Sequence, residues 1–199
     1  MRCFALLMLL VGVMAEDIAS PWPPVLEQTY PDLALQTLDG KPVNLRRFAG
    51  KPLLIELVGM PCAGCQAMLG GNRPGVGGYG GVAPQASIGA LNAYLKRDAR
   101  GLQVGDSSFT MVVILLYGMD MQAPSLEDAR AFAQHFRLGE REQVLVGDQR
   151  YIRDDVRSAI PGFHLVDREF RFRSDAGGGS APHPYWSHTF PLLARLAGR

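Results

Sequence analysis

The sequence predicts an α/β domain whose sheet pairs its central strands in parallel and ends in an antiparallel hairpin. Two nearly continuous apolar runs, residues 53–58 and 109–117, are typical of strands buried on both faces of a sheet. Strands and segments with helical spacing of apolar residues alternate from residue 53 onward. The chain has 199 residues, of which 47% are hydrophobic and 20% charged, so it is long enough for one compact domain and ordinary in composition.

The individual elements follow from local patterns. An Asp-Gly turn among alternating apolar and polar residues predicts a β-hairpin within residues 32–45. Seven of the twelve residues from 70 to 81 are glycine, which predicts a loop. A capping box formed by Ser125 and Asp128 predicts the start of a helix that continues to residue 136. The other expected elements are a helix at 85–100, a strand at 143–146, a helical stretch at 152–158, strands at 163–166 and 170–173, and a last helix at 187–197.

The N-terminal residues have the pattern of a secretory signal peptide. Arg2 supplies a positive charge, residues 4–14 form an unbroken small or apolar run, and the residues up to Ala15 resemble a cleavage site. The apolar run is about half of the roughly 20 residues that span a bilayer, so we expect cleavage near Ala15 rather than a membrane anchor. The predicted organisation is a signal peptide at 1–15, a proline-containing linker at 16–30 and a domain at 31–199.

Charge and cysteine content narrow the function. Arg2 is the one charge within the signal peptide, so the mature chain would carry 19 basic and 19 acidic residues. This balance gives no reason to expect nucleic acid or an anionic membrane surface as a partner. Cys3 would be removed with the signal, which leaves Cys62 and Cys65. In an exported protein, such an isolated and closely spaced pair is either redox-active or a metal site.

The cysteine pair follows a buried strand at the point where a helix is expected to begin. Unpaired N–H groups at a helix start stabilise a thiolate, which indicates that Cys62 is the nucleophile. The two-residue spacing lets Cys65 attack the mixed disulfide formed by Cys62 and release the partner. The sequence therefore predicts thiol-disulfide exchange.

Residues 31–199 resemble the thioredoxin superfamily, and most of all its periplasmic TlpA/ResA branch. Residues 31–54 are similar to the opening of redoxin domains, and residues 53–62 are similar to the strand that leads to the cysteines of thioredoxins. Residues 159–167 resemble the family segment that holds a cis-proline beside the disulfide. The resemblance implies a thioredoxin-like fold, with a central mixed sheet flanked by helices and the glycine-rich segment inserted after the start of the cysteine-bearing helix.

The resemblance also implies a catalytic set consisting of Cys62, Cys65, Glu56 and Pro161. Glu56 lies six residues before Cys62, where thioredoxins carry a buried acid, and would accept the proton of Cys65. Pro161 would be a cis-proline, and Ile160 before it would pair with an extended substrate segment.

Further expectations concern the surroundings of this set. Met60 and Pro61 would contribute to substrate binding, and Cys62 and Cys65 would form a disulfide. The substrates would be protein thiols and disulfides, a membrane protein would reset the pair, and no cofactor or resident metal is expected. Pro61 replaces a common aromatic residue, so the direction of electron flow is left open.

Two other functions are compatible with the same residues. A copper chaperone similar to the SCO family could use the soft ligands Met60, Cys62, Cys65 and Met68, although that family spaces its cysteines by three residues and supplies a histidine that this chain lacks at 158–159. A binding module with an idle disulfide is the other alternative. We expect a structural role for His164, which would point away from the sulfurs, and we expect His183 and His188 to lie in a surface segment.

Overall fold

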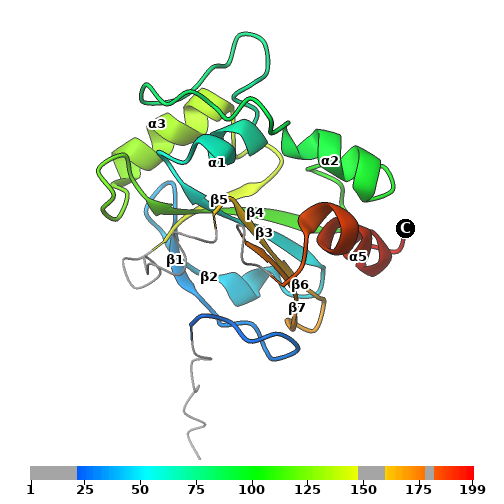
Figure 1. Ribbon diagram of the computed structural model, residues 1–199. Coiled ribbons are helices and arrows are strands. Elements are labelled where there is room, and N and C mark those ends of the chain that lie inside the picture. Colours follow the sequence, from blue (N-terminus) through cyan, green and yellow to red (C-terminus); the bar gives the residue numbers. More distant parts are fainter. Residues whose placement is uncertain (1–21, 148–159, 178–181) are drawn as a thin grey trace, which may run out of the picture.

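A computed structural model describes residues 22–147, 160–177 and 182–199 of the protein. These residues form a seven-stranded sheet in the order β2-β1-β5-β4-β3-β6-β7 (Figure 1). The central strands β3, β4 and β5 are parallel, and every outer pairing is antiparallel. This arrangement confirms the predicted mixed sheet. The strands are β1 (Ala34–Thr37), β2 (Pro42–Asn44), β3 (Leu53–Gly59), β4 (Thr110–Tyr117), β5 (Gln143–Val146), β6 (Gly162–Val166) and β7 (Phe172–Gly177).

The labelled helices pack against one face of the sheet, with α1, α2 and α3 at the top of Figure 1 and α5 at the right. They are α1 (Ala63–Met68), α2 (Leu91–Asp98), α3 (Leu126–Phe136) and α5 (Phe190–Leu196). Short turns of 3-10 helix at Leu45–Phe48 and of π-helix at Tyr185–Thr189 complete the described helical elements. The capping box is confirmed, since the Ser125 side chain accepts a hydrogen bond from the Asp128 backbone N–H at 3.0 Å.

Strand β3 separates two hydrophobic cores. Its seven residues are all buried, as the continuous apolar run predicts. Leu54 and Val58 point to the helix-covered face and belong to the same cluster as Cys65. Leu53, Ile55 and Leu57 point to the opposite face and pack in a second cluster. Because strand residues alternate between faces, Glu56 lies on the same side of the sheet as Cys65.

The helix expected at 85–100 is shorter than predicted and begins at Leu91. Backbone groups that precede Leu91 form hydrogen bonds with residues outside this helix. The Asn72 side-chain amide donates to the carbonyl oxygens of Gln85 and Ile88 at 2.9 and 2.8 Å, and the Gln85 N–H donates to the Ala63 carbonyl at 3.0 Å. These long-range bonds hold residues 85–90 as a loop against α1, which the helical spacing of apolar residues could not reveal.

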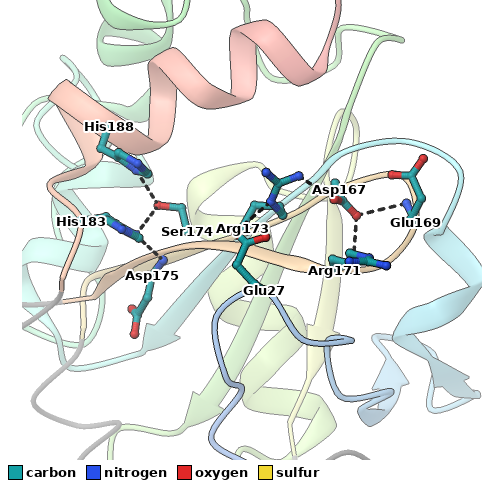
Figure 2. A network of polar contacts seen from close by, with 9 residues as sticks. All are labelled: Glu27, Asp167, Glu169, Arg171, Arg173, Ser174, Asp175, His183 and His188. Carbon is teal, nitrogen blue, oxygen red and sulfur yellow. Dashed lines mark hydrogen bonds and ion pairs between the residues drawn. The ribbon is translucent and has the colours of Figure 1, made fainter.

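Strand β7 begins later than the predicted strand at 170–173. Phe170 has a positive φ of 64°, so it belongs to the turn that follows β6. Asp167 organises this turn, because its Oδ1 accepts hydrogen bonds from the backbone N–H groups of Glu169 and Arg171 (Figure 2).

The last helix also differs from the prediction, since a π-helical turn precedes α5. The helical stretch expected at 152–158 lies outside the described residues.

Ordered structure begins before Pro31, within the segment that the sequence assigns to a linker. Tyr30 is fully buried. The Glu27 N–H donates to the Phe172 carbonyl at 2.8 Å, and the Tyr30 N–H donates to the Phe170 carbonyl at 2.8 Å. Residues 27–30 are therefore attached to the edge of β7. The expected signal peptide at 1–15 lies outside the described residues. Among those that are described, no helix combines the length and hydrophobicity needed to cross a membrane.

Candidate active site

Cys62 and Cys65 form a disulfide at the junction of β3 and α1, with their Cα atoms 5.2 Å apart. Cys62 is the N-cap residue of α1, and its Sγ accepts a hydrogen bond from the Cys65 backbone N–H at 3.1 Å. Cys62 is partly exposed, whereas Cys65 is fully buried. A reagent or substrate can therefore reach the sulfur of Cys62 first. The donated N–H would also stabilise negative charge on that sulfur when the bond is open.

Pro161 lies directly against the segment between the two cysteines. The Ile160–Pro161 peptide bond is cis, as the family resemblance implies. A Cβ atom built on Gly64 would lie 3.0 Å from both Cδ and Cγ of the Pro161 ring. Glycine at position 64 therefore permits the close approach of the proline to α1. The sequence shows Gly64 but gives no indication of the ring that packs on it.

The two residues before Cys62 occupy different environments. The side chain of Met60 is fully buried and packs in the core, so in this conformation it has no surface to offer a substrate. Pro61 is partly exposed beside the disulfide. Met68, the other thioether of the copper alternative, is also a core side chain in the cluster that contains Cys65.

Gln66 connects α1 to the glycine-rich segment and was missed by sequence reasoning. This buried side chain donates from Nε2 to the carbonyl oxygens of Met60 and Tyr79, at 2.7 and 3.2 Å. Its Oε1 accepts a hydrogen bond from the Tyr79 N–H at 2.8 Å. The Tyr79 ring then packs edge-on against Phe132 of α3, with the ring centroids 5.2 Å apart. The segment is thus anchored to α1 and α3.

Glu56 is the buried acid of the site. Its side chain is fully buried, and neither carboxylate oxygen has a hydrogen-bond partner among the described residues. Burial, and secondarily the negative charge of Glu142, raises the pKa of Glu56 to about 8. The carboxyl group can therefore gain or lose a proton close to the physiological pH range. Glu56 and Met68 line the same cavity, and Cys65 lies one helical turn before Met68 on α1.

The histidines lie on other parts of the molecule. His164 points to the sheet face opposite Cys65, where its Nδ1 is hydrogen-bonded to the Tyr30 hydroxyl at 2.8 Å. Burial lowers the pKa of His164 to about 3, so the ring is neutral. His183 and His188 stack with their ring centroids 4.0 Å apart, and both Nδ1 atoms approach the Ser174 hydroxyl (Figure 2). These two rings are thus integrated with β7 rather than lying in a free surface segment.

Comparison with known proteins identifies the architecture. The sequence matches no protein-family model and no curated protein. Among solved structures, a thiol:disulfide interchange protein from Bacteroides sp. is similar, with a TM-score of 0.55 and 13% identity over 88% of this chain and 92% of that chain. An uncharacterized thioredoxin-like protein from Porphyromonas gingivalis has a TM-score of 0.51 and 15% identity, over 87% of this chain and 94% of that chain. The chain shares the fold of these proteins.

Proposed function

We propose that this chain, which has a thioredoxin-like fold, is an exported thiol-disulfide oxidoreductase that exchanges disulfides with protein substrates through Cys62 and Cys65. The observation that carries the proposal is the unequal exposure of a closed cysteine pair beside a cis-proline. Cys62 is accessible and its sulfur accepts a backbone N–H, whereas Cys65 is enclosed behind it. This asymmetry is what a nucleophile followed by a resolving thiol requires.

In the direction of substrate reduction, the reaction has two steps. The Cys62 thiolate attacks a substrate disulfide, which forms a mixed disulfide and releases one substrate thiolate. Cys65 then gives its proton to Glu56, attacks the Cys62 sulfur and releases the second substrate thiolate. Two electrons pass to the substrate, and the Cys62–Cys65 disulfide is formed. Substrate oxidation is the reverse sequence.

Ile160 and Pro161 would hold the substrate during this exchange. Pro161 lies against Gly64, between the two cysteines, and Ile160 is partly exposed two residues before β6 begins. An extended substrate segment could pair with the Ile160 backbone and bring its sulfur to Cys62. Pro61, also partly exposed, would contact the substrate on the other side of the nucleophile.

The test uses two variants that control for each other. The reduced Cys65→Ser and Cys62→Ser proteins are each mixed with a peptide that contains one internal disulfide, and adducts are measured by mass spectrometry. The Cys65→Ser protein should accumulate a mixed disulfide, because the resolving thiol is missing. The Cys62→Ser protein should form little or none, because Cys65 is buried. Equal trapping by both variants, or no trapping by either, would refute the assignment.

Export of the protein and the direction of electron flow are tested separately. Mass spectrometry of the protein from the extracytoplasmic fraction should show a mature N-terminus near residue 16, and retention of residues 1–15 in the cytoplasm would contradict export. Equilibration of the wild-type pair with glutathione buffers gives its reduction potential. A value near that of thioredoxin indicates a reductant, and a value near that of the strong periplasmic oxidants indicates an oxidant.

A further inference from the structure

A cavity of about 310 Å³ opens beside Glu56, within the helix-covered half of the molecule. Its walls come from the end of α1, the loop before α2, the first half of β4, the end of α3 and the loop that leads to β5. Neither cysteine and neither residue of the Ile160–Pro161 pair is among its lining residues. The cavity therefore reaches Glu56 from a side that is separate from the proposed substrate contact.

The cavity explains the unpaired carboxyl group of Glu56. A buried polar atom without a partner is destabilising, and such atoms in native proteins are usually satisfied by protein groups or by water. Both Glu56 oxygens lack a partner among the described residues, and Glu56 lines this space. The volume is ample for several water molecules. Water in the cavity would satisfy the carboxyl group and connect it to bulk solvent.

A second carboxyl group, that of Glu142, lines the same cavity. Glu142 is partly buried just before β5, and burial raises its pKa as well. Its charge acts on Glu56, since repulsion from Glu142 is the second cause of the raised Glu56 pKa. The other charged residues of the lining are Arg73, Arg137, Glu140 and Arg141. The three acidic residues of the lining differ in exposure. Glu140 is exposed, Glu142 is partly buried and Glu56 is fully buried.

We propose that Glu142 and the water of this cavity form a proton relay that connects Glu56 with bulk solvent. The relay would serve the thiol-disulfide exchange proposed above, and its function rests on that proposal. When Cys65 attacks, its proton passes to the Glu56 carboxylate, from there through water to the Glu142 carboxylate, and then to solvent, while the electron pair stays on sulfur. A substrate bound over Cys62 and Pro161 would leave this route open.

The test compares Glu142→Gln with Glu140→Gln, which removes the same charge from the same loop. Two readouts are needed. The first is the pKa of Glu56, measured from carboxyl carbon chemical shifts during a pH titration of the oxidised protein. The Glu142→Gln change should lower it by removing a nearby negative charge, and Glu140→Gln should leave it close to the wild-type value.

The second readout is the ring-closing step alone. Reduced protein is mixed with oxidised glutathione, and release of glutathione from Cys62 by Cys65 is followed under rapid mixing. Glu142→Gln should slow this step about tenfold near neutral pH, and formate should restore part of the rate by carrying the proton through the cavity. The Ala90→Leu variant, which adds bulk to a partly buried wall residue without a charge change, should slow the step as well.

These results separate the relay from the exchange function. Trapping by Cys65→Ser together with identical ring-closing rates in Glu142→Gln and Glu140→Gln would overturn the relay and leave the exchange function in place. A lower Glu56 pKa in Glu142→Gln without any change in rate would also overturn it, because it would show charge repulsion but no proton transfer. Failure of trapping in an otherwise folded protein would instead overturn the exchange function.

Discussion

Replacement of Glu56 by glutamine should stabilise the protein, and the gain should grow with pH. The raised pKa of Glu56 determines the direction of this pH dependence. Glu56 has a pKa of about 8 in the folded protein against an ordinary value of 4.5. Between these values the unfolded chain releases the proton while the folded protein keeps it, so the free energy of unfolding falls as pH rises. The stability that the folded protein gains by keeping this proton is fully present below pH 4.5 and is lost by about pH 8.

The magnitude follows from the same two values. One pKa unit corresponds to about 1.4 kcal/mol, so the wild-type protein loses roughly 3 kcal/mol from this group between pH 4.5 and pH 7. Glutamine has nearly the same shape and does not ionise. The stability difference between Glu56→Gln and wild type should therefore increase by about 3 kcal/mol over this interval and level off above about pH 8.

Urea unfolding of the oxidised proteins, followed by tryptophan fluorescence, measures this difference across the pH range. Glu140→Gln is the matched control, because Glu140 is exposed and its replacement should give a nearly pH-independent difference. If the curve for Glu56→Gln ran parallel to that of wild type at every pH, the carboxyl group would ionise equally in both states. The inferred environment of Glu56 would then be wrong.

Three further changes test the packing around the site. Gly64→Ala would place a methyl group 3.0 Å from the cis-proline ring, so it should lower the free energy of unfolding by about 1–3 kcal/mol and slow exchange with a peptide disulfide. Unchanged values in both assays would contradict the close approach. Tyr30→Phe removes the hydroxyl bonded to His164, and urea unfolding should show a loss of about 1–3 kcal/mol, whereas a neutral result would argue against that bond. Gln66→Ala removes the side chain that binds both backbone groups of Tyr79, so amide hydrogen exchange at Tyr79 should accelerate, and unaltered protection would show that other contacts hold the loop.

The position of the cysteine pair could be predicted from the sequence, but its surroundings could not. The spacing of Cys62 and Cys65 after a continuous apolar run was enough to predict a strand, a helix start and a cysteine pair at their junction. The contact between Pro161 and Gly64 joins residues almost a hundred positions apart. Local patterns carry no information about such a contact, and the family resemblance implied only that a cis-proline lies beside the disulfide.

The two side chains that define the interior of the site show the same limit. A glutamine in a short helix has no pattern that marks it as buried, and Gln66 is buried because the glycine-rich segment folds back over α1 and offers it backbone partners. Glu142 had no distinguishing feature either. Its relation to Glu56 arises because β5 lies beside β4, and β4 beside β3, so that the loop before β5 closes the cavity.

The sequence by itself determined the order and type of most elements, the cysteine pair and the burial of the strand that carries Glu56. These properties depend on the alternation of apolar and polar residues and on spacing over a few positions, which act locally. Tertiary structure alone decided where α2 and β7 begin, how Gln66 becomes buried, and which segments form the cavity beside Glu56. Those outcomes depend on hydrogen bonds and cavities formed between distant segments, and they exist only after the sheet and the helix layer have assembled.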